Sequence, residues 1–418
     1  MQSLDLYRSI LDGNREGKGG GVASICSAHP LVLKALFRTA KRRDTLALVE
    51  STSNQVDQFG GYTGMKPADF ARMVHELADA EGFPRERILL GGDHLGPNTW
   101  VAEGPEAAMA KTRDLVAAYV KAGYRKIHLD ASFVCKGDPV PITDEIVSAR
   151  AAEMAEVAEA SWEGEPPVYI IGTEVPYPGG VVDEEEDEMH VTGADDVRAT
   201  IEAFRAAFAA RGLEAAWERV TGVVVQPGVE FGDGLVQDYK GAEALSKVIL
   251  DYPGMVFEAH STDYQTPANL SRLVRDHFAI LKVGPWLTWA LREGFMALEL
   301  IERELAPAAP SAFRETLVGA MRDNPKYWRS YYTGSEAEIA YKLVYSYSDR
   351  ARYYLPAEAV KASVERLFAN LDGGLAEGLL SQFLPNQYRA VREGRVAAAP
   401  EDLAIDRVAE IIGLYLDA

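Results

Sequence analysis

The sequence predicts a (β/α)8 barrel, an α/β fold in which eight parallel strands close into a ring that helices surround. Short apolar or β-branched runs recur eight times along the first three hundred residues, and amphipathic stretches separate them. Strands that are apolar almost throughout suit a parallel sheet covered on both faces. Eight successive strand–helix units suit a closed barrel of about 250 residues.

The expected strands occupy residues 21–27, 46–51, 88–93, 126–131, 168–174, 222–227, 255–260 and 278–284. Apolar residues recur at three-to-four spacing in 67–82, 105–123 and 143–160, which is typical of crossover helices. An open doubly wound sheet is the alternative architecture. No GxGxxG motif follows an early strand to support it.

The strand pattern fades after Leu305. Residues 306–313, APAAPSAF, are expected to form a linker, and helical patterns follow at 335–346, 356–371, 374–381 and 401–417. We therefore predict two parts, a barrel over 1–305 and a helical C-terminal extension over 306–418.

Charge and cysteine content exclude several classes of function. The formal net charge of −20 argues against general affinity for nucleic acid or for anionic membranes. We expect a cytoplasmic protein, because no apolar run approaches the roughly 18 residues of a membrane span and the N-terminus lacks a signal-peptide pattern. Cys26 and Cys135 lack metal-binding spacing and are expected to be free thiols. Residues 13–21, GNREGKGGG, miss the spacing of a phosphate-binding loop, so we expect no kinase activity.

Polar side chains stand at the carboxyl ends of the expected strands, where barrel enzymes assemble their sites. They are Glu50, Asn54, Gln55, Asp93, His94, Asp130, Ser132, Glu174, Gln226, Glu230, His260, Ser261, Asp263 and Lys282. Helix capping explains Ser132 and Asp263 equally well, since both side chains accept hydrogen bonds from free N–H groups. Capping rarely uses histidine, so a functional role is favoured for Asp93–His94 and His260, and likewise for the carboxylate of Glu174.

Two imidazoles and a carboxylate at a barrel mouth match the ligand set of a catalytic divalent metal ion such as zinc. Asp93, beside His94, could move a proton or orient the imidazole. Lys282 could neutralise a phosphate or carboxylate. A Schiff-base role stays open for Lys126, Lys136 or Lys282, because desolvation can lower the pKa of a lysine. Packing or surface roles are expected for the other histidines, His29, His75, His128, His190 and His277.

Several long motifs resemble a known family. They are ESTSNQVDQFGGYTGM (50–65), GGDHLGPN (91–98), KIHLDASF (126–133), EVPYPGG (174–180), VVQPGVEF (224–231), FEAHSTDYQTP (257–267), LKVGPWLTWALRE (281–293) and YSDRARYY (347–354). The chain resembles the GatZ/KbaZ family over nearly its whole length. That family comprises the non-catalytic subunits of class II D-tagatose-1,6-bisphosphate aldolase, often labelled tagatose-6-phosphate kinases.

The resemblance implies a barrel like that of class II aldolases, whose catalytic subunits carry an Asp-His pair after strand three and further zinc-binding histidines after strands six and seven. Here Asp93–His94 and His260 look like the first and last of these. The middle histidine is not evident, and the stretch offers Gln226, a poor zinc ligand, and Glu230 instead. The resemblance thus implies a metal set of His94, His260, Gln226 and Glu230, with Asp93 and Glu174 as catalytic residues.

Three functions in carbohydrate metabolism follow from the residues and the resemblance. The first is an accessory subunit that stabilises or completes a separate class II aldolase catalytic subunit, acting on tagatose phosphates in galactitol or N-acetylgalactosamine catabolism. The second is a metal-dependent aldolase or retro-aldol epimerase acting on a ketose or keto-sugar acid. The third is a regulatory module that binds a sugar phosphate. Association into a homo-oligomer stays open, and the expected substrate-binding residues are Glu50, Asn54, Gln55, Asp130, Ser132, Ser261, Asp263 and Lys282.

Overall fold

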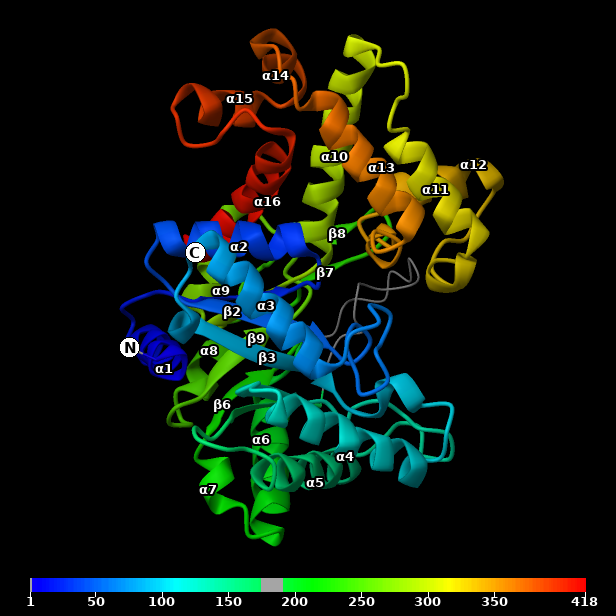
Figure 1. Cartoon of the computed structure of the whole chain (residues 1–418). Coiled ribbons are helices and arrows are strands. Elements are labelled where there is room, and N and C mark those ends of the chain that lie inside the picture. Colours follow the sequence, from blue (N-terminus) through cyan, green and yellow to red (C-terminus); the bar gives the residue numbers. More distant parts are fainter. Residues whose placement is uncertain (1, 174–190) are drawn as a thin grey trace.

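Eight parallel strands close into a barrel in the part of the chain that this computed structural model describes, residues 2–173 and 191–418 (Figure 1). Around the ring the order is β1-β10-β9-β6-β5-β4-β3-β2. The strands are β1 (Val22–Cys26), β2 (Ala47–Thr52), β3 (Ile88–Leu95), β4 (Lys126–Leu129), β5 (Val168–Ile171), β6 (Val220–Val224), β9 (Val256–Ala259) and β10 (Ile280–Val283). The predicted (β/α)8 barrel is therefore confirmed, and each expected strand coincides with an observed one.

Helices connect the strands and cover the outside of the barrel. They are α2 (Pro30–Arg42), α3 (Pro67–Glu81), α4 (Pro105–Lys121), α5 (Asp144–Glu159), α6 (Ala194–Ala210), α7 (Glu214–Trp217), α8 (Glu243–Ile249), α9 (Pro267–Arg275) and α10 (Pro285–Leu305). Several begin with proline, which suits the first helical turn because its missing N–H would have no partner there. Short 3-10 turns, η1 (Arg85–Arg87) and η2 (Pro97–Trp100), flank β3, and β7 (Glu230–Phe231) and β8 (Val236–Gln237) form a small antiparallel sheet.

The N-terminal helix α1 (Ser3–Arg15) packs its apolar face onto one end of the barrel interior. Leu4, Tyr7 and Leu11 are buried against strand residues that include Val22 and Leu48. The sequence interpretation contained no helix here. Helix α1 thus covers the end of the barrel opposite the strands' carboxyl termini.

The C-terminal extension is helical, as expected, and packs back onto the barrel (Figure 1). It comprises α11 (Phe313–Asp323), η3 (Pro325–Tyr327), α12 (Glu336–Tyr345), η4 (Ala351–Tyr353), α13 (Glu358–Leu371), α14 (Glu377–Phe383), α15 (Pro385–Arg392) and α16 (Pro400–Leu416). The sequence interpretation did not contain α11 and α15. Helix α16 lies against α2 and α10, and Tyr415 donates a hydrogen bond to the backbone oxygen of Thr262 (2.7 Å). Barrel and extension thus share one apolar core.

Within residues 2–173 and 191–418, none of the helices combines the length and the apolar character that crossing a membrane requires.

Candidate functional site

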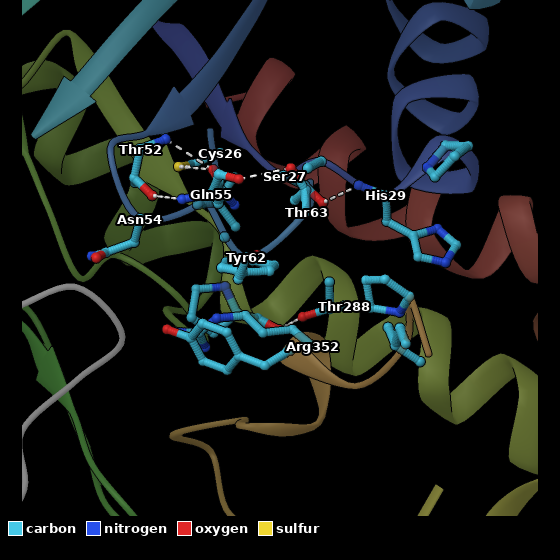
Figure 2. Close-up of a pocket in the computed structure, with 18 of the residues that line it drawn as sticks. Cys26, Ser27, His29, Thr52, Asn54, Gln55, Tyr62, Thr63, Thr288 and Arg352 are labelled. Carbon is cyan, nitrogen blue, oxygen red and sulfur yellow. Dashed lines mark hydrogen bonds between the residues drawn. The ribbon is translucent and has the colours of Figure 1, made fainter. Parts of the chain in front are cut away.

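A cavity of about 500 Å³ opens at the carboxyl ends of the barrel strands. Eight of the residues singled out from the sequence line it: Asn54, Gln55, Asp93, His94, His260, Ser261, Asp263 and Lys282. Figure 2 shows one wall, where the loop after β2 folds so that Gln55 accepts a hydrogen bond from the backbone N–H of Thr52 (2.9 Å). Arg352 and Tyr353 of the extension complete the lining. The strand ends therefore converge as barrel geometry predicts.

Three imidazoles meet at the base of this region. The ring centroids of His94 and His260 lie 5.0 Å apart, and each lies 5.3 Å from the ring of His128. All three side chains are buried. Sequence reasoning expected His128 to have a packing or surface role, so its position beside the other two is a finding of the structure.

Four buried residues, Asp93, His128, Glu258 and His260, could together hold a metal ion. One ligand atom from each lies within 4.8 Å of the others. Nε2 of His128 is buried and has no hydrogen-bond partner within the described residues. Burial lowers the pKa of His260 to about 4, so this imidazole is neutral at pH 7, as metal ligation requires. Two imidazole nitrogens and two carboxylates are donors that suit zinc or a similar ion.

The charges around this group are unbalanced in a way that a cation would offset. Within the described residues, four buried carboxylates, those of Glu50, Asp93, Asp130 and Glu258, are grouped with two ammonium groups and the imidazole of His94. Lys126 Nζ lies 2.6 Å from both Glu50 Oε1 and Glu258 Oε2. Lys282 Nζ lies 2.6 Å from Asp93 Oδ2 and also pairs with Glu50. Buried charge without a counter-charge is costly, which favours a bound divalent ion.

The two lysines are held in their charged form. Burial opposes the ammonium group of Lys126, but Glu258 and Glu50 outweigh it and raise the pKa of this lysine. At Lys282, Asp93 and Glu50 likewise outweigh burial and raise the pKa well above its ordinary value. A Schiff-base nucleophile needs the opposite, a lowered pKa. The ion pairs therefore give no support to such a role for Lys126 and Lys282.

His94 is positioned by groups behind the cavity wall. Its Nδ1 lies 2.7 Å from Asp130 Oδ2, and the hydroxyl of Ser132 donates to the other oxygen of that carboxylate (2.6 Å). Burial opposes protonation of His94, but Asp93 and Asp130 outweigh it and raise the pKa of the imidazole. His94 also adopts a positive φ of 46°, a strained conformation for a residue other than glycine. Asp130 and Ser132 do not line the cavity; Asp130 contacts His94 and Ser132 contacts Asp130.

The glycines around Asp93–His94 make room for this arrangement. A Cβ on Gly91 would lie 2.6 Å from Oε1 of Glu50, inside the lysine–carboxylate network. A Cβ on Gly96 would lie 1.6 Å from the backbone oxygen of Asp130. The motif GGDHLG thus has glycine where the neighbouring strands approach most closely.

Three residues of the metal set that the resemblance implied, His94, Gln226 and Glu230, lie outside the group of four potential ligands. The side-chain oxygen of Gln226 accepts hydrogen bonds from the backbone N–H groups of Gly228 (2.9 Å) and Val229 (3.2 Å), so it stabilises its own turn. Glu230 accepts a hydrogen bond from the backbone of Phe231 (3.0 Å), and burial raises its pKa to about 7. Neither belongs to the group of four potential ligands.

Other predicted site residues lie elsewhere or outside the description. Glu50 is buried inside the barrel beneath the cavity, where it pairs with the two lysines. Glu174 and His190 lie outside the described residues. Sequence reasoning named Lys126 only as an open Schiff-base candidate, gave His128 a packing or surface role, and missed Glu258 and Arg352. The first three could have been found from a period of two, because Lys126/His128 and Glu258/His260 each place two polar side chains on the same face of an otherwise apolar strand.

The fold and the site define a (β/α)8-barrel protein with a polar cavity and a buried histidine–carboxylate group at the carboxyl ends of its strands. The model of the D-tagatose-1,6-bisphosphate aldolase subunit GatZ/KbaZ-like family matches residues 7–418. The chain therefore belongs to the GatZ/KbaZ-like family, as the sequence resemblance indicated, and to carbohydrate metabolism.

Solved structures include a similar chain from Sinorhizobium meliloti 1021, described as a probable tagatose 6 phosphate kinase. It is 47% identical, covers 95% of this chain and 99% of its own, and has a TM-score of 0.88. The fructose-bisphosphate aldolase of Campylobacter jejuni is 14% identical over 89% of this chain and 98% of its own, with a TM-score of 0.48. The YdjI aldolase of Escherichia coli K12 is 10% identical over 87% and 95%, with a TM-score of 0.44. The two aldolase similarities bear on neither substrate nor mechanism.

Proposed function

We propose that this chain is itself a metal-dependent enzyme that makes or breaks carbon–carbon bonds by aldol chemistry, as an aldolase or retro-aldol epimerase of a ketose or keto-sugar acid. The observation that supports this most directly is the buried Nε2 of His128, which has no hydrogen-bond partner among residues 2–173 and 191–418 and lies beside His260, Glu258 and Asp93. A buried polar atom without a partner costs about 1–3 kcal/mol and calls for a functional explanation. Metal binding is such an explanation.

In this proposal His128, His260, Glu258 and Asp93 hold a divalent ion, with zinc as the expected metal. When bound, such an ion supplies Lewis-acid stabilisation of negative charge on a substrate oxygen. Asp93 was predicted from the sequence to move a proton. Although burial opposes its ionisation, His94 and Lys282 outweigh it and hold the pKa of Asp93 well below its ordinary value, which suits a ligand better than a proton carrier.

His94 is the better proton carrier at this site. Its Nδ1 is fixed by Asp130, and the side chain lines the cavity, so Nε2, which lies 3.7 Å from Asp93 Oδ2, is the nitrogen that can reach a substrate. In a retro-aldol step His94 takes the proton of the substrate hydroxyl as the carbon–carbon bond breaks, and the electron pair of that bond moves toward the ketose carbonyl. After the aldehyde fragment has rotated, the enolate carbon re-forms the carbon–carbon bond on the other face of the aldehyde carbonyl, and return of the proton from His94 to the new alkoxide gives the epimer. If the aldehyde is released instead, the overall reaction is the cleavage that an aldolase catalyses.

Hydrogen-bonding groups on the cavity wall suit a polyhydroxylated substrate. Asn54, Gln55, Ser261 and Asp263 line the cavity beside the imidazoles. Burial raises the pKa of Asp263 to about 6, and its Oδ1 accepts hydrogen bonds from the backbone N–H groups of Gly284 (3.1 Å) and Trp286 (2.8 Å). Glu174 stays a predicted catalytic residue.

The test is metal analysis of the purified chain together with aldolase and epimerase assays on D-tagatose, D-fructose and their phosphates. We expect about one divalent ion per chain, turnover that a chelator abolishes, and recovery when the ion is restored. Absence of a bound metal, together with absence of turnover by the chain alone, would contradict the proposal.

The second candidate is the accessory role, which the family's description as an aldolase subunit favours. In that case the chain stabilises or completes a separate catalytic subunit. It should co-purify with a class II aldolase and raise the partner's activity or heat stability. If the partner's activity and melting temperature are the same with and without this chain, the accessory role is excluded.

A further inference from the structure

A segment of the C-terminal extension, residues 347–354, reaches the mouth of the barrel and is fixed there by backbone contacts. The N–H groups of Tyr347 and Ser348 donate to the backbone oxygens of Asp233 and Gly232, each at 3.1 Å. The hydroxyl of Tyr264, in the loop after β9, donates to the backbone oxygen of Tyr347 (2.9 Å). This segment is therefore attached to the barrel independently of the helices that flank it.

Arg352 projects from this segment into the cavity lining, next to Tyr62 (Figure 2). Its guanidinium is held by two hydrogen bonds, from Nη1 to the backbone oxygen of Asp349 (2.7 Å) and from Nη2 to the hydroxyl of Tyr353 (3.1 Å). The Tyr353 ring packs against Tyr62 at 4.7 Å and stacks on Tyr327 at 4.8 Å between centroids. These contacts fix the arginine before a ligand arrives, which reduces the entropy lost on binding.

Within the described residues the guanidinium of Arg352 forms no ion pair, although Asp349 and Asp263 attract it over a longer distance. Among the described residues, no carboxylate lies within ion-pair distance of its guanidinium, and the two hydrogen bonds use two of its five N–H donors. Lys282, the other cation deep in the lining, is already paired with Glu50 and Asp93. Lys361 also lines the cavity but is exposed on α13. A fixed guanidinium with free donors matches the geometry of a carboxylate or phosphate group.

We propose that Arg352 binds the anionic end of the substrate, a carboxylate or a phosphate, while the reacting carbons lie at the three imidazoles. The inference rests on the proposed function, because it takes this cavity to be the substrate site. With this role for Arg352, the C-terminal extension is part of the active site, and the preferred ligand is an acidic sugar rather than a neutral one.

The test is calorimetric binding of three probes that share one carbon skeleton: neutral D-tagatose, its 6-phosphate, and the keto acid with a carboxylate at carbon 6. Each is titrated into the full chain, wild type and variant, with and without chelator. We expect wild type to bind at least one anionic probe about ten- to a hundredfold more tightly than D-tagatose. The anionic probe that binds more tightly than D-tagatose shows whether the anionic end of the substrate is a carboxylate or a phosphate.

Arg352→Ala should abolish this preference while leaving binding of D-tagatose within about threefold of wild type, a change of less than 1 kcal/mol. Arg352→Lys keeps the charge but not the forked geometry, so it should retain part of the preference for anionic probes. Arg366→Ala removes an exposed arginine on α13 that does not line the cavity, and it should change nothing. Circular dichroism and the melting temperature check folding of each variant.

Two outcomes overturn the inference: wild type binds the anionic probes no more tightly than D-tagatose, or Arg352→Ala weakens all three probes equally. Failure of the proposed function has a different signature. In that case the chain holds no metal and turns over no sugar, yet the preference for anionic probes still depends on Arg352.

Discussion

His128 and Asp93 are joined in the barrel interior, where Nδ1 of the imidazole lies 3.0 Å from Oδ1 of the carboxylate. The contact fixes the ring with its other nitrogen, Nε2, toward Glu258 and His260. Carboxylates that hold the far nitrogen of a histidine orient the ring and raise its basicity as a metal ligand. Asp93, on the neighbouring strand β3, orients the ring of His128 in this way. It also supplies one oxygen to the group of four potential ligands.

His128→Ala should abolish metal binding, because it removes the nitrogen that has no other partner. We expect the metal content measured by mass spectrometry to fall from about one ion per chain to near zero, with activity falling in parallel. His75→Ala, on the outer helix α3, is the matched control and should retain both. A His128→Ala variant with wild-type metal content would show that the buried group is structural.

Asp130→Asn should lower activity without removing the metal. Asp130 contacts His94, which is outside the group of four potential ligands, and loss of such an orienting carboxylate costs about 10- to 100-fold. Since Asp130 helps to raise the pKa of His94, the variant should also shift the acid limb of the pH–rate profile to lower pH. Ser132→Ala, one step further away, should have a smaller effect. An unshifted profile would argue against His94 as the proton carrier.

Lys126→Met should destabilise the fold strongly. Its ammonium group is fully buried between Glu50 and Glu258, and removing one partner of a buried ion pair costs about 3–5 kcal/mol because the remaining charges lose their compensation. Urea unfolding measures the loss. Lys121→Met, at an exposed position of α4, is the control. Adding Glu50→Gln to Lys126→Met should restore part of the stability, and a loss below about 1 kcal/mol for Lys126→Met alone would contradict the ion-pair argument.

Polar residues at the end of an apolar run could be predicted from the sequence, whereas His128 and Glu258, inside such runs, were not. Asp93, His94 and His260 stand where an apolar run ends, so the barrel rule places them at the mouth. His128 and Glu258 lie inside apolar runs, where a polar residue stands at every second position. From the sequence alone such positions resemble the apolar core, because only closure of the barrel brings their side chains together. Gln226 and Glu230 were implied by the family resemblance, and the local turn uses their side chains instead.

Arg352 shows a second limit of sequence reasoning. The motif YSDRARYY was visible in the sequence, but nothing local indicates that this segment returns to the barrel mouth. Its position depends on pairing between residues more than a hundred apart, such as Tyr347 with Asp233. Helical periodicity predicted several helices of the extension correctly because each is a local pattern, while their docking depends on the shared core.

Gly96→Ala should disturb the site from the loop after β3. The new Cβ would lie 1.6 Å from the backbone oxygen of Asp130, so the strand end that holds His94 must move. Overpacking of this kind costs about 1–3 kcal/mol or more, and we expect a comparable loss of unfolding free energy together with reduced activity. Gly104 lies in the same connection, and a Cβ there would meet no atom within 4 Å. Gly104→Ala should therefore change the unfolding free energy and the activity little. Equal effects of the two variants would contradict the steric argument.

Glu230→Gln should remove a pH dependence of stability. Burial raises the pKa of Glu230 from 4.5 to about 7, so the folded chain holds this proton more tightly than the unfolded chain. The protonated carboxyl therefore contributes stability below about pH 4.5, and the contribution is lost as pH rises toward and through 7. The full loss is on the order of 3 kcal/mol.

Urea unfolding at pH 4.5, 6 and 8 measures this effect as the difference between Glu230→Gln and wild type, so that other titrating groups cancel. The variant should gain relative stability steadily across this range, because its amide cannot ionise. Glu218→Gln, at an exposed position after α7, should show a constant difference. If the difference for Glu230→Gln is also constant with pH, Glu230 is ionised in the folded chain and must have a cationic partner, such as a bound metal ion.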